Sequence, residues 1–242
     1  MSLTLSGTKA LLLAGGLGSR LRPITNTTPK CLVEIGNRPL LDFWLQSLVE
    51  AGIDRILINT HYLPEQVETF CRASKYSPLI DLIYEPELLG TAGTLIANRN
   101  YFDDKILLAH ADNFTLFNPD EFMKSHLHRG SNCQATMMTF TTDTPTSCGI
   151  VEVDQHGVLI GYHEKVANPP GNRANAAVFL LEQSCLEWLD RMPNAVDFCK
   201  EIVPLGIGQF QTFHNTLYHR DIGTIESLKQ ANLDYPKLLK TQ

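Results

Sequence analysis

The chain has 242 residues, of which 43% are hydrophobic and 19% charged, an ordinary composition for a globular protein with a sizeable core. Its formal net charge of −6, without any basic run, argues against nucleic acid or an anionic membrane as a partner. No apolar run is long enough for a signal sequence or a membrane span, and the six cysteines show neither C-x-x-C nor zinc-binding spacing. We therefore expect a cytoplasmic protein with reduced thiols.

The first half of the chain alternates between strand-like and helix-like segments. Apolar runs predict buried strands over 9–14, 55–59, 79–84 and 105–111. Helical spacing and helix-end signals predict helices over 39–51, 64–73, 91–100 and 119–127. Strands that alternate with helices predict a largely parallel sheet covered on both faces, so the expected fold class is α/β.

The pattern changes near residue 132, where strands begin to follow one another. Strands are predicted over 133–140, 149–154, 158–164 and 176–181, and residues 155–157 are typical of a hairpin turn. Later segments predict helices over 182–191 and 197–205, a last pair of strands over 210–214 and 217–220, and a closing helix over 224–233. Since no segment is typical of a linker, we expect one domain over residues 1–242.

A glycine-rich and basic loop follows the first predicted strand, in the sequence LLLAGGLGSRLRPITNTTPK of Leu11–Lys30. Glycines allow backbone N–H groups to approach an anion closely, and the charges of Arg20 and Lys30 suit phosphate oxygens. A solvated turn is the alternative interpretation. Three glycines with Arg20 and Lys30 behind one buried strand favour a polyphosphate site.

Two common phosphate-binding loops do not fit this sequence. A P-loop requires Lys followed by Ser or Thr after its last glycine, but Ser19 and Arg20 follow Gly18. A dinucleotide-binding loop requires a third glycine where Leu21 stands, and no acidic ribose ligand follows about 20 residues later. An NAD(P)-dependent oxidoreductase is therefore disfavoured.

From Leu12 to Lys30 the chain follows the pattern L-x-A-G-G-x-G-[ST]-R-L-x-P-x-T-x-x-x-P-K, and it is identified by this resemblance as a member of the sugar-1-phosphate nucleotidyltransferases. The resemblance implies an enzyme that uses Mg²⁺ to form an NDP-sugar and pyrophosphate from an NTP and a sugar 1-phosphate. It also implies a Rossmann-like three-layer α/β/α fold with a mixed, mainly parallel central sheet.

The resemblance further divides the domain into a nucleotide-binding half, about 1–130, and a sugar-phosphate-binding half, 131–242. Because the chain ends at Gln242, we expect no C-terminal β-helix domain of the kind that many members carry. The sequence leaves open whether the protein forms a homo-oligomer.

The catalytic residues that the resemblance implies are Arg20, Lys30 and Asp112, with Arg20 near the β- and γ-phosphates and Lys30 near the α-phosphate. The metal ligands would be Asp112, which ends a predicted strand, and Asp221, in a D-I-G-T motif. Capping of a turn by Asp112 and of the closing helix by Asp221 is the structural alternative. The implied nucleotide-binding residues are Leu13, Ala14, Gly15, Gly16, Gly18, Ser19, Glu85, Gly90 and Thr91.

The implied sugar-phosphate-binding residues lie in the second half of the chain. Glu164 and Lys165 match the E-K pair of the family, in which the lysine contacts the phosphate and the glutamate a sugar hydroxyl. Gly149 and Asn175 match two further positions near the sugar. An exposed charged pair and ordinary strand residues are the structural alternative. Ala177 stands where the family usually has glycine, which places a methyl group near the sugar site.

The segment Leu89-Gly90-Thr91-Ala92-Gly93 most closely resembles the mannose-1-phosphate guanylyltransferase branch, which favours GTP with mannose 1-phosphate or a related sugar. Thr91 is also available as a helix N-cap. The G-L-A-Q pattern of the thymidylyl enzymes is absent. A uridylyl- or thymidylyltransferase stays open, as does a non-catalytic regulatory protein that binds a nucleotide sugar.

Overall fold

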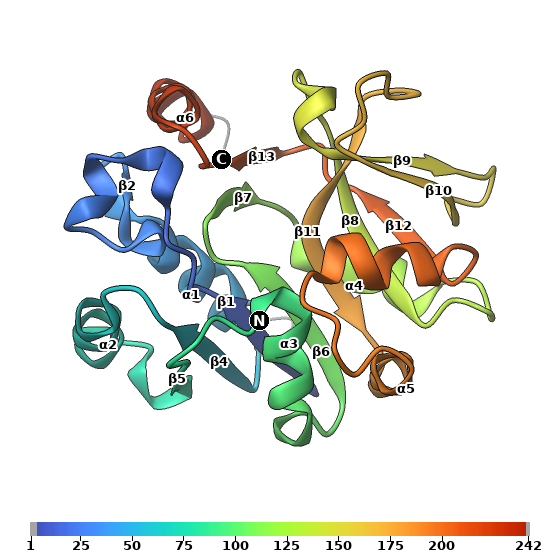
Figure 1. Ribbon diagram of the computed structural model, residues 1–242, viewed down its shortest axis with the longest axis horizontal. Helices are drawn as coiled ribbons and strands as arrows, with labels where there is room; N and C mark the ends of the chain where they lie inside the picture. Colours follow the sequence, from blue (N-terminus) through green and yellow to red (C-terminus); the bar gives the residue numbers. More distant parts are fainter. Residues whose placement is uncertain (1–3, 241–242) are drawn as a thin grey trace.

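A nine-stranded mixed sheet runs through the computed structural model, which describes residues 4–240 (Figure 1). Its main path has the order β10 (Leu159–Glu164), β9 (Gly149–Val153), β11 (Arg173–Leu181), β6 (Lys105–His110), β1 (Thr8–Leu13), β4 (Arg55–Thr60) and β5 (Ile80–Tyr84). Off this path, β8 (Ala135–Thr141) pairs with β11, and β12 (Phe210–His214) pairs with β8.

The first-half strands are parallel, as predicted, because each returns to the sheet through a helix. β1 pairs in parallel with both β4 and β6, and β4 pairs in parallel with β5. The helices are α1 (Leu40–Glu50), α2 (Pro64–Ala73), α3 (Gly90–Ala97), α4 (Pro119–Leu127), α5 (Leu186–Asp190) and α6 (Ile225–Leu238). β11 is antiparallel to β6, which makes the sheet mixed.

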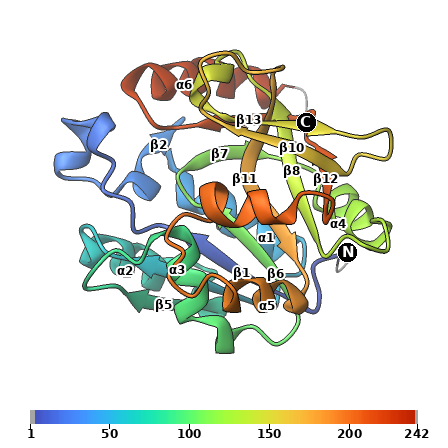
Figure 2. The same ribbon diagram turned by 45° about the vertical axis from the view of Figure 1, so that its right-hand side comes forward.

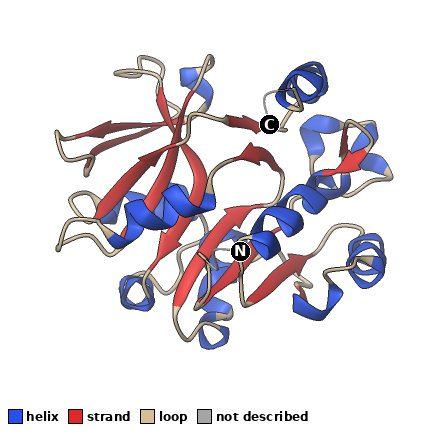
Figure 3. Cartoon of the chain, turned by 180° about the vertical axis from the view of Figure 1, so that it is seen from behind, coloured by secondary structure: helices blue, strands red, loops and turns tan. Residues whose placement is uncertain are grey.

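The central strand β1 supplies side chains to both faces of the sheet. Ala10 and Leu12 belong to a cluster that also contains buried residues of α1, α2 and α4, whereas Leu11 and Leu13 belong to a second cluster with residues of α3 and α5. This alternation is the period of two that a strand imposes on its side chains. Figure 3, seen from behind, shows the helices arranged around the strands. The expected α/β fold with helices on both faces is confirmed.

The predicted pairing of the last two strands is wrong. β12 runs parallel to β8, whereas β13 (Tyr218–Asp221) pairs antiparallel with β7 (Asn113–Leu116), a short strand that the sequence did not predict. Asn215 lies between them, and its Nδ2 donates to Leu116 O at 3.0 Å and to Tyr218 O at 3.1 Å. These bonds turn the chain from the large sheet toward β7. In Figure 2, β13 and α6 lie near each other at the upper edge of the molecule.

Two predicted helices of the second half are shorter or irregular. The segment 182–191 forms a 3₁₀ turn, Gln183–Cys185, followed by the short α5. The segment 197–205 forms a π-helical turn, Phe198–Ile202, followed by a 3₁₀ turn, Val203–Gly206. Pro204 lacks the N–H that a continuous α-helix would need there. The sequence also did not predict the small hairpin of β2 (Glu34–Ile35) and β3 (Arg38–Pro39).

All six cysteines are free thiols. Among the helices of residues 4–240, none is both long and apolar enough to span a bilayer.

His126 makes the stability of the fold depend on pH. The ring is fully buried on α4, with Nδ1 2.9 Å from Thr136 Oγ1. Burial, assisted by the charges of Arg129 and Lys105, lowers the pKa of His126 to about 3, although Glu182 Oε1 lies 3.2 Å from its Nε2. Its pKa in the unfolded chain is about 6.5. The unfolded state therefore takes up a proton first, so this contribution to stability is complete above pH ~6.5 and is lost as the pH falls toward 3.

We expect the free energy of unfolding to fall by about 2 kcal/mol through this group between pH 7 and pH 5, since each unit below the unfolded pKa costs about 1.4 kcal/mol. Urea denaturation at the two pH values measures the loss. His126→Gln should reduce the pH dependence, and His128→Gln, at an exposed ring on the same segment, should leave it unchanged. An equal pH dependence in wild type and His126→Gln would contradict the assignment.

Candidate active site

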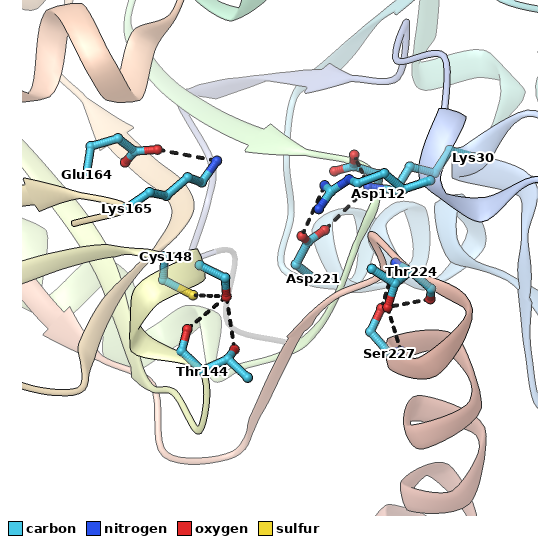
Figure 4. A network of polar contacts seen from close by, with 11 residues as sticks. Lys30, Asp112, Thr144, Cys148, Glu164, Lys165, Asp221, Thr224 and Ser227 are labelled. Carbon is cyan, nitrogen blue, oxygen red and sulfur yellow. Dashed lines mark hydrogen bonds and ion pairs between the residues drawn. The ribbon is translucent and has the colours of Figure 1, made fainter. Parts of the chain in front are cut away.

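Three charged side chains from distant parts of the chain meet at one edge of the sheet (Figure 4). Lys30 Nζ lies 2.5 Å from Asp112 Oδ2 and 3.4 Å from Asp221 Oδ1. The Lys30 side chain is only 9% exposed, whereas that of Asp221 is 56% exposed. A single ammonium group therefore bridges the two aspartates that the sequence predicted as metal ligands.

The fold holds Asp112 in a short turn between β6 and β7. Ala111 N donates to Leu13 O at 3.0 Å, which ties the start of this turn to the end of β1. Asn113 O accepts a hydrogen bond from the buried Trp44 Nε1 of α1, and Asn113 Nδ2 donates to Ala176 O. Hydrogen bonds to β1, α1 and β11 thus fix the turn that carries Asp112.

The pairing of β13 with β7 brings Asp221 to the same place. In this antiparallel pair Asp221 lies opposite Asn113, the residue after Asp112. The helix that follows is capped by Thr224, whose Oγ1 accepts from Ser227 N while Ser227 Oγ accepts from Thr224 N (Figure 4). Because Thr224 supplies the cap, the alternative role of Asp221 as a helix cap is not needed.

The electrostatics of the cluster keep Lys30 and Asp112 charged. Burial by itself would lower the pKa of Lys30, but the carboxylates of Asp112 and Asp221 raise it above its ordinary value. Burial would raise the pKa of Asp112, but the Lys30 ammonium holds it below its ordinary value. At neutral pH the buried Lys30 ammonium therefore stays paired with the ionised Asp112 carboxylate.

Arg20 enters this cluster from the glycine-rich loop. One of its guanidinium nitrogens, NH2, lies 3.9 Å from Asp221 Oδ2, and the side chain is 69% exposed. Gly18 shapes the loop just before it, with a φ of 61° and a carbonyl that accepts from Thr25 Oγ1 at 2.7 Å. A Cβ on Gly18 would lie 2.8 Å from Thr25 Cγ2, so both conformation and space require glycine. Arg20 is therefore available to an anionic ligand.

The remaining predicted residues of this loop follow the end of β1. Leu13, Ala14 and Gly15 are buried, whereas Gly16 and Ser19 are exposed. Ala14 N donates to Asn59 Oδ1 at 2.7 Å, and Asn59 is a residue that the sequence analysis missed. Its signal was a polar residue at the end of the apolar run 55–59, which forms β4, the strand beside β1.

The predicted nucleotide-binding residues after β5 are engaged within the protein. Glu85 is buried, and its Oε1 accepts from Thr94 Oγ1 at 2.6 Å and from Asn59 Nδ2 at 3.2 Å. Its Oε2 accepts from Leu89 N at 3.3 Å, which anchors the start of α3. The predicted role of Thr91 as N-cap is wrong, because α3 begins at Gly90 and Thr91 Oγ1 accepts from Phe198 N at 2.7 Å. That these residues bind a nucleotide stays a prediction.

The four predicted sugar-phosphate residues lie near one another. β9 and β10 pair so that Glu164 lies opposite Gly149, and Lys165 Nζ lies 3.4 Å from Glu164 Oε1. Asn175, on β11, contacts the same group through Tyr162, whose hydroxyl is 3.4 Å from Asn175 Nδ2. Figure 4 shows Lys165 extending toward the side on which Lys30, Asp112 and Asp221 lie.

Ala177 departs from the family at a position where backbone conformation matters. Its φ of 53° lies in the left-handed region that glycine adopts readily and alanine rarely. The register between β11 and β8 shifts between Asn175 and Phe179, which accounts for the unusual backbone. Glycine, which the resemblance led us to expect here, would adopt this backbone conformation more readily than alanine.

The donor set suits a magnesium ion that binds together with its substrate. Asp112 and Asp221 both contact the same Lys30 ammonium, which places the two carboxylates near each other. Within residues 4–240 no group of three or more His, Cys, Asp or Glu side chains is placed to hold a metal. Mg²⁺ commonly uses one or two carboxylates together with substrate phosphates and water, which is what this pair can offer.

Comparisons with known proteins bear on the family and the fold of this chain. Residues 9–237 match the family model described as nucleotidyl transferase. The mannose-1-phosphate guanylyltransferase catalytic subunit beta of Drosophila pseudoobscura pseudoobscura is 32% identical over 228 residues, which cover 90% of this chain and 60% of that protein. The mannose-1-phosphate guanyltransferase of Yarrowia lipolytica is 33% identical over 205 residues, covering 81% and 54%. The chain thus spans a little over half the length of these relatives.

A solved structure shows the same fold. A protein from Bacillus anthracis described as a glucose-1-phosphate thymidylyltransferase superposes with a TM-score of 0.82, covering 93% of this chain and 94% of that one. Its sequence is 20% identical, so the similarity concerns the fold alone.

The role of Lys30 as the counter-ion of two carboxylates is open to a stability test. We expect Lys30→Ala to lower the free energy of unfolding by about 2 kcal/mol at pH 7 in EDTA, since it leaves two neighbouring anions without a cation. The loss is smaller than the roughly 3–5 kcal/mol of a fully buried pair because Asp221 remains partly in solvent. Chemical denaturation provides the measurement, and excess Mg²⁺ should restore part of the loss.

Lys165→Ala is the matched control, because the Lys165 side chain is 58% exposed and its partner is a single carboxylate. We expect little change in stability for this variant. Equal destabilisation of both variants, or no recovery of Lys30→Ala with Mg²⁺, would argue against a shared cation site between Asp112 and Asp221.

Proposed function

The chain belongs to the nucleotidyl transferase family, and on this premise we propose that it transfers a nucleotidyl group from an NTP to a sugar 1-phosphate and releases pyrophosphate. The observation that carries the proposal is the Lys30 ammonium between Asp112 and Asp221, at the end of the sheet where the glycine-rich loop also lies. Lys30 and the neighbouring Arg20 can bind phosphate oxygens, while the two aspartates can hold a cation that the same phosphates also contact.

In the proposed reaction, an oxygen of the sugar phosphate forms a bond to the α-phosphorus of the NTP while the bond from that phosphorus to the leaving pyrophosphate breaks. The attacking phosphate is already ionised at neutral pH, so no general base is required. Catalysis then depends on positioning and charge neutralisation. Lys165 would hold the attacking phosphate, while Arg20 and Lys30 would neutralise the triphosphate.

Mg²⁺ would be held by Asp112 and Asp221, and when bound it supplies positive charge to the reacting phosphates. The proposal includes GTP as the nucleotide, mannose 1-phosphate or a related sugar as acceptor, and the cytoplasm as location. Support for these substrates comes from the names of the curated relatives and from the LGTAG segment at 89–93. A uridylyl- or thymidylyltransferase is the alternative within the family.

A pyrophosphate-release assay across NTPs and sugar 1-phosphates, with Mg²⁺ present, tests the proposed function. We expect the fastest release with GTP and mannose 1-phosphate. Faster release with UTP or TTP would select the alternative enzyme. Binding of a nucleotide sugar without release from any pair would refute the transferase and favour a regulatory protein.

The charged cluster gives the proposed activity a specific mutational signature. Arg20→Ala and Asp112→Asn should each lower the rate of pyrophosphate release by roughly 10²–10³, because each removes a contact that neutralises charge in the transition state. Thermal unfolding should show that both variants remain folded. Arg22→Ala is the control, since Arg22 lies exposed on the same loop and should keep a near-normal rate. Near-normal rates for Arg20→Ala or Asp112→Asn would refute this mechanism.

A further inference from the structure

The Glu164 carboxylate is held by a residue that the family resemblance did not indicate. Tyr162 lies two residues earlier on β10, and its hydroxyl donates to Glu164 Oε2 at 2.7 Å. Burial raises the pKa of Tyr162, so the phenol remains a proton donor at neutral pH. The other carboxylate oxygen, Oε1, contacts only the exposed Lys165 ammonium among the ion pairs of the described residues. One Glu164 oxygen is thus fixed by the protein, and the other is open to a ligand.

Asn175 takes part in this same network. Its Oδ1 accepts from Ala177 N at 2.8 Å. Its Nδ2 lies 3.4 Å from the Tyr162 hydroxyl and 3.3 Å from Cys199 Sγ, so its two N–H groups have one acceptor each. The amide therefore orients the phenol, and the phenol orients the carboxylate.

Gly149 leaves the space that the phenol occupies. A Cβ at this position would lie 2.2 Å from the Tyr162 hydroxyl oxygen and 2.7 Å from Glu164 Oε2. No side chain could be added without displacing both groups. The φ of Gly149 is not in the left-handed region, so the requirement for glycine here is one of space.

We propose that Tyr162 is a positioning residue for the sugar, which fixes Glu164 Oε2 so that Oε1 accepts a hydroxyl of the sugar 1-phosphate. Asn175 then acts on the sugar through Tyr162 and not by direct contact. The inference rests on the proposed function, because that function makes Glu164 a sugar ligand. It assigns to Gly149, Tyr162 and Asn175 a single task, which is to hold one carboxylate in one orientation.

Tyr162→Phe removes the hydroxyl and keeps the ring. We expect a roughly tenfold rise in KM for mannose 1-phosphate, with kcat and the KM for the NTP nearly unchanged, since a hydrogen bond to a charged group is lost on the sugar side alone. Calorimetric titration with mannose 1-phosphate should show the same weakening without any turnover. Tyr101→Phe is the matched control, because the Tyr101 hydroxyl donates to the Asp81 carboxylate at 2.6 Å, outside both halves of the site.

A double-mutant comparison separates positioning from general damage. Because Tyr162 acts through Glu164, Tyr162→Phe should add no further loss of affinity in a Glu164→Ala background. Asn175→Ala should weaken binding in the same direction and add little to Tyr162→Phe. Unchanged affinity in Tyr162→Phe, or full additivity with Glu164→Ala, would overturn the inference while leaving the proposed function intact. A wild-type protein that neither binds a sugar 1-phosphate nor releases pyrophosphate would refute the proposed function itself.

Discussion

The bridge from the Lys30 ammonium to the carboxylates of Asp112 and Asp221 is the interaction on which the active end of this molecule depends. A lysine that is 9% exposed needs anionic partners, because an unpaired ammonium is costly to remove from water. The partners lie 82 and 191 residues away in the sequence. Three features of the fold bring the two aspartates to Lys30. They are the turn after β6, the pairing of β13 with β7 and the capped start of α6.

A second cluster of polar side chains, around Glu164, lies on β9, β10 and β11 in the second half of the chain. It differs from the first in that one carboxylate oxygen is fixed by a neutral phenol, while the charged partner Lys165 is exposed. The segment around Phe198 and Cys199 contacts both α3 and β11. Phe198 N donates to Thr91 at the start of α3, and Cys199 Sγ accepts from Asn175 on β11. The loop after β5 and the predicted sugar site are thus joined through two consecutive residues.

Elements with local signals could be predicted from the sequence. α2 and α4 have the predicted bounds. Their starts have clear local signals, because each helix has proline in its first turn. Asn118 also caps α4 by accepting hydrogen bonds from the backbone N–H groups of Asp120 and Glu121. β1 and its glycine-rich loop were recognisable from an apolar run followed by glycines and Arg20. The family resemblance indicated Asp112 and Asp221 together, but their meeting depends on the pairing of β13 with β7, which the sequence did not predict.

The features that were missed depend on contacts between distant segments. The separation of β12 from β13 depends on a hydrogen bond from Asn215 to Leu116, on a strand about 100 residues earlier, which no local pattern encodes. Tyr162 looks like an ordinary strand residue until the pairing of β9 with β10 places Gly149 beneath its hydroxyl. Asn59 likewise gains its role only from the parallel neighbour β1.

A crystal structure of the protein with Mn²⁺ and GTP, analysed for the anomalous signal of the metal, tests the central role of the Lys30 cluster most directly. The account predicts a manganese ion in contact with the carboxylates of both Asp112 and Asp221, and triphosphate oxygens within reach of Arg20 and Lys30. A metal ion bound away from these two aspartates, or a triphosphate away from Lys30, would contradict it.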